Sequence, residues 1–211
     1  MVLMSSWKNV VARWGSGAGE TDDVRIDGST NALESISYEH HEIHAGSSFT
    51  CHYSNDVTNI GEMTAIAFNT PNTTKWAHLI YEVESTGACY VSLCENPSID
   101  DDEGTQLTIY NRDRNSATAS TVTSIETVPV ANKATSYTEA QAAGANITTT
   151  TELARTYVGA GERKSEGGGS RGTHEFVLDQ NQQYIVLIYS LTTDDATHNL
   201  TLDWYEHTNR H

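Results

Sequence analysis

Residues 184–191, YIVLIYSL, and residues 198–206, HNLTLDWYE, decide the fold class of this 211-residue chain. β-Branched, aromatic and leucine side chains dominate both stretches, and a Thr-Asp-Asp turn signal separates them. Every second residue from Leu200 to Trp204 is apolar, whereas threonine and aspartate occupy the positions between them. This two-residue period is typical of a β-strand that buries one face and exposes the other.

The same two-residue rhythm extends through most of the chain from Leu33 onward. Further strands are predicted at residues 47–53, 62–69, 75–83, 88–95, 107–110, 122–130, 152–158 and 174–178. Residues 75–83, KWAHLIYEV, are apolar on both sides, which is typical of a strand in the interior of a sheet. The tryptophans of two predicted strands, Trp76 and Trp204, are expected to lie in the core. Alternating strands and helices are absent, which argues against a parallel sheet. The pattern predicts an all-β fold, specifically a jelly-roll-like antiparallel β-sandwich.

We divide the chain into an N-terminal arm at residues 1–32 and a β-sandwich domain at residues 33–211. At the start of the domain, residues 38–44, YEHHEIH, alternate and predict a strand. A loop-rich insertion spans about residues 111–172. Within this insertion, a capping-box pattern at residues 136–139 predicts a short helix at 137–143, and the glycines between 159 and 172 predict a mobile loop.

The N-terminal arm carries an apolar stripe. Trp7, Val10, Val11 and Trp14 have the spacing of one face of a short amphipathic helix. Gly15 follows directly and would end that helix, and the stretch GSGAGETDD that it begins has the composition of a linker. An apolar stripe on a linker has the form of a docking element, so these four residues are our candidate partner-binding residues. The alternative, that the two tryptophans pack on the chain's own domain, stays open.

The chain is strongly acidic, with a formal net charge of −16 from 28 acidic and 12 basic residues. A surface of this sign repels phosphate groups, so we expect neither nucleic acid nor an anionic membrane surface as a partner. No segment has the apolar length of a membrane span, and the opening MVLM is too short for the apolar region of a signal peptide. We therefore expect synthesis in the cytoplasm.

Three cysteines, Cys51, Cys89 and Cys94, form no even-numbered disulfide framework. Cys89 and Cys94 lie five positions apart in a predicted strand. An odd spacing places them on opposite faces, where they cannot readily form a disulfide with each other. We expect three buried, reduced thiols.

The histidines His40, His41 and His44 are the most conspicuous candidates for a metal site. On a strand, His40 and His44 would share one face, and additional ligands such as Glu206 or His207 would have to come from elsewhere. The segment is not the zinc-protease motif His-Glu-x-x-His, because it is one residue too short. A hydrogen-bonded cluster in the core or at an interface is the favoured interpretation, and we expect no metal.

Two further segments resemble functional loops only in composition. The acidic loop Asp100, Asp101, Asp102 and Glu103 lacks the ligand spacing of an EF-hand, so we interpret it as a solvated loop, with a weak cation site as the alternative. Residues 159–165, GAGERKS, do not form a phosphate loop, because no glycine directly precedes the lysine and no helix-forming segment follows. We find no catalytic or cofactor-binding motif, and we expect neither a cofactor nor an enzymatic activity.

Five phrases of the sequence, in this order, resemble the jelly-roll head proteins of tailed bacteriophages. They are YEHHEIHAGSSF (38–49), FNTPNTTKWAHL (68–79), NRDRNS (111–116), HEFVLDQNQQYIVLI (174–188) and LDWYEH (202–207). The proteins that they resemble are decoration, or cement, proteins on the outside of the capsid. The resemblance covers roughly residues 34–207 and leaves the arm unmatched. It implies an all-β jelly roll that is commonly trimeric and has no catalytic residues.

The resemblance gives the first functional expectation, which is a structural protein of the virion. We expect it to be made in the host cytoplasm and to bind the major capsid protein on the outer surface of the capsid. We also expect it to be a homotrimer. It assigns no role to the Thr/Ser/Ala-rich stretch at residues 117–150. The main alternative is a receptor- or glycan-binding β-sandwich of a tail fibre or adhesin, whose exposed tyrosines and Asn/Asp-rich loops would contact sugars. A virion-associated hydrolase is a third class, and no set of residues predicts it.

Overall fold

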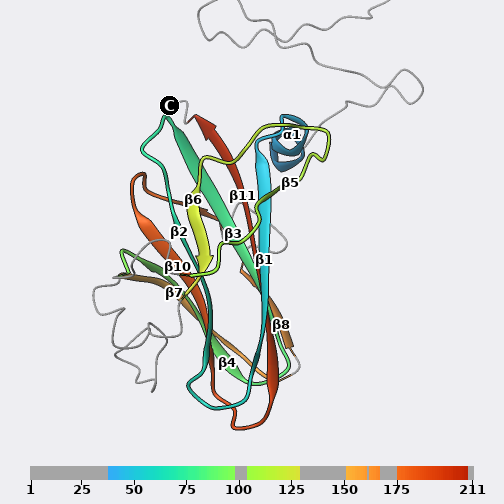
Figure 1. Ribbon diagram of the computed structural model, residues 1–211, viewed down its shortest axis with the longest axis vertical. Coiled ribbons are helices and arrows are strands. Elements are labelled where there is room, and N and C mark those ends of the chain that lie inside the picture. Colours follow the sequence, from blue (N-terminus) through green and yellow to red (C-terminus); the bar gives the residue numbers. More distant parts are fainter. Residues whose placement is uncertain (1–37, 98–103, 129–150, 161, 167–174, 209–211) are drawn as a thin grey trace, which may run out of the picture. The chain divides into compact units, whose positions relative to one another are not determined.

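The computed structural model describes residues 38–97, 104–128, 151–160, 162–166 and 175–208 (Figure 1). The chain divides into two compact units, Met1–His41 and Glu42–His211. The second unit is a sandwich of two antiparallel β-sheets, which confirms the predicted fold class. The predicted arm at residues 1–32 lies outside the described residues.

The helix α1 (Tyr38–His44) precedes the first described strand. Gly46, which has a φ of 71°, ends the helix. The N–H of Gly46 donates to the carbonyl oxygen of Ile43, and the N–H of Ser47 donates to the carbonyl oxygen of Glu42, both at 3.0 Å. This pair of bonds is a Schellman motif, in which glycine adopts the left-handed backbone that closes a helix. The strand predicted at residues 38–44 is therefore wrong, because alternation over so short and polar a segment does not distinguish strand from helix.

The first sheet is built around its longest strand, β11. Its strands in spatial order are β5 (Tyr110–Asn111), β1 (Ser48–Val57), β11 (Ala196–Thr208), β3 (Lys75–Ser85) and β8 (Glu162–Glu166), and β9 (Phe176–Val177) also pairs with β3. All pairings are antiparallel. The register runs from Ser48 opposite Tyr205 to Val57 opposite Ala196, so β1 pairs with β11 along its whole length.

The second sheet is built around β10. Its strands in spatial order are β6 (Thr123–Thr127), β2 (Met63–Asn69), β10 (Gln183–Ser190), β4 (Cys89–Glu95) and β7 (Thr151–Val158). These pairings are antiparallel as well. The register shifts once between β2 and β6 and once between β4 and β7, so the irregularities lie at the two edge strands.

Eight of these strands follow the order of a jelly roll. Numbered one to eight along the chain, β1, β2, β3, β4, β7, β8, β10 and β11 lie in the orders one-eight-three-six and two-seven-four-five. Each connection therefore crosses between the sheets, except the one from the fourth to the fifth strand. That connection contains β5 and β6, which add an edge strand beside β1 and beside β2. The structure thus confirms the predicted jelly roll.

The main core lies between the two sheets. Leu200, Leu202 and Trp204 of β11 point into it and are at most 2% exposed, whereas Thr201 and Asp203 between them are half-buried. The orientation predicted for this strand is confirmed. The core position predicted for Trp204 is confirmed too.

Trp76 was also predicted to be a core residue, and the structure contradicts this. It is only half-buried, because β3 places Ala77 in the core and Trp76 on the opposite side of the strand. There it lies opposite His207 of β11. The aromatic ring is therefore part of the outer side of the first sheet.

The second sheet is apolar on its outer side as well as its inner side. A separate cluster of residues, each at most 3% exposed, forms what we call the outer apolar face: Met63, Ala65, Ala67, Cys94, Val128, Ile185, Leu187 and Tyr189. The central strands β2 and β10 are consequently buried on both sides. β3, which was predicted to be an interior strand, does lie between β11 and β8, although Ile80, Glu82 and Glu84 on its outer side are only half-buried.

The insertion predicted at about residues 111–172 contains the strands β6, β7 and β8. β6 and β7 correspond to the strands predicted at residues 122–130 and 152–158, whereas β8 was not predicted. β8 pairs with β3 inside the segment predicted as a mobile loop, since the glycines flank the sequence ERKSE and do not interrupt it. The helix predicted at residues 137–143 lies outside the described residues.

Candidate functional site

The candidate partner-binding residues of the arm, Trp7, Val10, Val11 and Trp14, lie outside the described residues, and so does the acidic loop at residues 100–103. Their roles stay predictions. The functional candidates that the structure places are histidines, carboxyl groups, thiols and polar turns of the second unit.

The three histidines for which a hydrogen-bonded cluster was predicted do not lie in the core. His40, His41 and His44 are exposed on α1, whereas Glu42 of the same helix is 5% exposed. The hydroxyl of Ser47 donates to the Glu42 carboxyl group and, at 3.1 Å, to the Glu42 carbonyl oxygen. Within the described ranges, no group of three or more histidine, cysteine or acidic side chains is arranged to hold a metal ion.

Glu206, considered above as an additional metal ligand, is instead the acceptor in a buried hydrogen-bond network. Its carboxyl oxygens accept from the hydroxyl of Ser120 at 2.5 Å and from the backbone N–H of Thr121 at 3.0 Å. They also accept from the hydroxyl of Thr121 at 2.5 Å and from Nε1 of Trp204 at 3.0 Å. Glu206 therefore holds the segment before β6 against β11, which is a structural role.

A histidine group that the sequence did not reveal lies on the outer side of the first sheet. The ring of His78 stacks on Tyr205 and packs against His207, with centroid distances of 4.5 and 4.4 Å. Oε2 of Glu175 lies 3.3 Å from Nδ1 of His78 and accepts a hydrogen bond from the Tyr205 hydroxyl at 3.0 Å.

The pairing of His78 with Glu175 has the form of a catalytic histidine held by a carboxylate. Such a pair needs a nucleophile within hydrogen-bond reach of the other ring nitrogen. That nitrogen, Nε2 of His78, is buried and makes no hydrogen bond with any described residue. The group is therefore best explained as aromatic packing fixed by one carboxylate.

His198 lies inside the sandwich and is 0% exposed. Its Nδ1 is 3.2 Å from Oγ1 of Thr64, which also accepts a hydrogen bond from Nδ2 of Asn55 at 3.1 Å. Burial lowers the pKa of His198 from 6.5 to about 4, against a smaller opposing effect of the Glu62 carboxylate. The imidazole is therefore neutral at pH 7, and its Nδ1 can accept the proton of the threonine hydroxyl.

The three cysteines are buried and form no disulfide, as the sequence predicted. Cys89 lies in the core between the sheets and Cys94 in the outer apolar face, so their placement on opposite sides of β4 is confirmed. Burial raises the pKa of Cys51 to about 12 and that of Cys89 to about 11. These two thiols are therefore protonated at physiological pH and are poor nucleophiles.

An open hollow of about 500 Å³ lies at the end of the second sheet where β2 ends and where β6 and β10 begin. We call it the amide hollow, because five of its eight lining residues are amides: Asn69, Asn72, Asn181, Gln182 and Gln183. The other three are Thr70, Pro71 and Thr123. Sequence reasoning missed this site, although the phrases NTPN and DQNQQ that form most of it are visibly rich in amides.

Comparisons of the chain with models of protein families, with curated proteins and with solved structures found no match. Along the described part of the chain, no helix has both the length and the apolar character that crossing a membrane requires.

Proposed function

We propose that this chain is a decoration protein that binds the outer surface of a tailed-phage capsid and stabilises its lattice. The jelly-roll order of the eight strands carries the proposal, since that is the fold implied by the sequence phrases between residues 34 and 207. A decoration protein works through contacts with its neighbours, and a capsid multiplies many modest contacts by symmetry.

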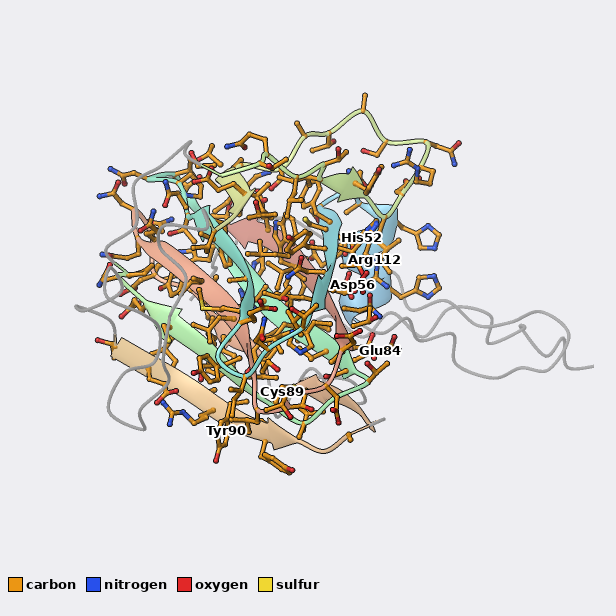
Figure 2. All side chains as sticks on the ribbon, turned by 60° about the horizontal axis from the view of Figure 1, so that its bottom comes forward. His52, Asp56, Glu84, Cys89, Tyr90 and Arg112 are labelled. Atoms are coloured by element: carbon orange, nitrogen blue, oxygen red, sulfur yellow. The ribbon has the colours of Figure 1, made fainter. Side chains whose placement is uncertain are left out.

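The distribution of charge supports a position outside the capsid. The net charge is −16, and acidic side chains lie along the outer side of the first sheet, including Asp56, Glu84 and Asp203. Figure 2 shows Asp56 and Glu84 on the same side of the sandwich. Such a surface is repelled by packaged DNA and is compatible with a site on the exterior of the shell.

The flank formed by β7 supports self-association. β7 is the edge strand of the second sheet, and Leu153 and Tyr157 on it are 39% and 55% exposed. Tyr157 packs edge-on against Tyr90 of β4, with ring centroids 5.8 Å apart, and Tyr90 projects away from the sandwich (Figure 2). Exposed aromatic and aliphatic side chains beside an open strand edge favour a contact with another chain, here a second copy in a homotrimer.

Binding to expanded capsids tests the proposal. We expect the purified chain to cosediment with expanded capsids assembled from the major capsid protein of the phage that encodes it. The double substitution Trp7→Ala and Trp14→Ala should reduce this binding at least tenfold, because it removes the two largest apolar side chains of the arm. Asn9→Ala, in the same segment but off the stripe, is the matched control and should bind like the unmodified chain.

Two further measurements accompany the binding assay. Sedimentation velocity should report a trimer of 23.1-kDa chains for all three proteins, because the arm is not proposed to hold the trimer together. Circular dichroism should report the same β-rich spectrum. The proposal is wrong if the unmodified chain does not bind expanded capsids. If the tryptophan variant binds undiminished, the arm is not the docking element.

A further inference from the structure

We propose that the amide hollow is a binding site for a neutral, hydroxyl-rich ligand of the carbohydrate class. This inference goes beyond the proposed decoration function, since it concerns turns of the sandwich and not the arm or the β7 flank. The volume of about 500 Å³ lies within the range of about 300–1,000 Å³ that is usual for small-ligand sites, enough for one to a few sugar rings.

The chemistry of the lining selects the class of ligand. None of the eight lining residues is charged, although the chain as a whole carries a net charge of −16. A site for phosphate, sulfate or carboxylate groups would present arginine or lysine, and a site for a divalent cation would present carboxylates. Side-chain amides instead supply both donors and acceptors, which match the hydroxyl groups of a neutral sugar.

Several of these amides are available for a ligand. Within the described residues, the side chains of Asn72, Asn181 and Gln182 make no hydrogen bond. Asn72 and Asn181 are exposed, and Gln182 is half-buried. They therefore present donors and acceptors that the fold itself does not use.

The backbone around the hollow is held rigidly, so little ordering is needed when a ligand binds. Thr70 links the two turns: its hydroxyl donates to the carbonyl oxygen of Asp179 at 2.6 Å and accepts from the N–H of Gln182 at 3.0 Å. The N–H of Thr70 donates to the carbonyl oxygen of Gln182 at 2.9 Å, and the N–H of Asn181 to that of Pro71 at 3.4 Å. The pairing of Asn69 with Gln183 continues this framework into the sheet.

The conformation of Asn181 provides a substitution that removes an amide without disturbing the fold. Its φ of 56° lies in the left-handed region, which glycine adopts without strain. Asn181→Gly therefore deletes the side chain and keeps the turn. Asn96 has a φ of 53° and does not line the hollow, so Asn96→Gly is its matched control. Asn72→Ala is matched in the same way by Asn115→Ala, an exposed asparagine in another loop.

The experiment applies the full chain to an array of neutral, sialylated and sulfated glycans and then measures the affinity of the best neutral glycan by calorimetry. We expect selective binding of neutral glycans. Asn181→Gly and Asn72→Ala should each weaken binding about three- to tenfold, the effect of losing one or two hydrogen bonds, and the two control substitutions should leave it unchanged. In NMR spectra of the unmodified chain, the glycan should shift the side-chain amide signals of residues 72, 181 and 182.

Three results would each overturn the inference: no binding of any neutral glycan at millimolar concentration, a preference for the sulfated or sialylated glycans, or equal losses in the hollow variants and their controls. The NMR measurement needs no substitution, so it decides the question even if a variant fails to fold. Capsid binding by the tryptophan-substituted arm is a separate assay, and the failure of either proposal leaves the other standing.

Discussion

The two outer sides of the sandwich differ sharply in composition. On the first sheet, β1 presents Thr50, His52, Ser54 and Asp56 outward, none of which is buried. On the second sheet, the outer apolar face is at most 3% exposed. The first sheet thus behaves as an antiparallel sheet with one solvated side, and the second behaves as a layer between two cores.

The central strands of the two sheets, β11 and β10, therefore differ in how fully their outer sides are packed. β11 is buried on its inner side from Ala196 to Glu206, whereas on its outer side Tyr205 is buried and the other residues are half-buried. β10 is packed on both sides over nearly all of its length. We therefore expect the second sheet to contain the positions where the fold is least tolerant of substitution, including positions that face away from the main core.

The largest expected effect is the loss of stability caused by Leu187→Ala. Leu187 belongs to the outer apolar face and is 0% exposed, so its removal leaves a cavity and should lower the free energy of unfolding by about 2–5 kcal/mol. The matched change on the other outer side, Thr201→Ala on β11, should alter it by no more than about 0.5 kcal/mol. Urea unfolding measures both. Equal effects would show that the two sides are not packed differently.

The next effect is acid destabilisation through His198, which lies between the two sheets. The folded chain holds its pKa at about 4, below the unfolded value of 6.5, so protons favour the unfolded state. The neutral form is compatible with full stability above pH 6.5. Stability should then fall as the pH drops from 6.5 to 4. The total loss is about 3 kcal/mol, which is the pKa shift of His198 multiplied by the free energy that corresponds to one pKa unit.

His198→Asn removes this titration, and it should flatten the dependence of the unfolding free energy on pH between 6.5 and 4. The half-exposed His207→Asn is the control and should retain the slope. Urea unfolding at several pH values measures the difference. If the slope persists in His198→Asn, other groups account for the acid sensitivity, and the interior is more accessible to water than its burial indicates.

The smallest effect is kinetic and concerns the thiols. Cys51 and Cys89 are enclosed between the sheets, whereas Cys94 is in the outer apolar face. In the native chain, all three should react with a disulfide reagent at pH 8 far more slowly than in urea, since all are buried. A native population in which only Cys94 reacts would mean that the outer apolar face opens without unfolding of the core. Peptide mapping distinguishes the three sites.

The sequence predicted the sandwich well where one side of a strand is polar. In β11 the alternation identified both sides correctly, because solvent and core impose different residues at successive positions. The prediction that β3 lies inside a sheet is also confirmed, although Ile80, Glu82 and Glu84 on its outer side are only half-buried. The unbroken apolar run YIVLIY of β10 agrees with a strand buried on both sides, but it does not identify what packs on the outer side.

The candidate sites were harder to predict than the fold. The amide hollow joins residues near 70, near 123 and near 182, and only the pairing of β2 with β6 and β10 brings them together. The same holds for the group around His78, whose members come from β3, β11 and the segment before β9. Conversely, the histidines of α1 are neighbours in sequence, but they are exposed and do not form a core cluster. The alternative that they lie at an interface stays a prediction.

The connection between β4 and β7 changes which strands lie at the edges of the sandwich. Through β5 and β6, it adds a short strand beside β1 and another beside β2, so neither of these two strands is an edge of its sheet. β7, with eight residues, is then the longest edge strand in the described part of the chain. Short edge strands present little main chain for pairing with another chain. The connection therefore leaves the β7 flank as the edge with the most main chain available for an added strand.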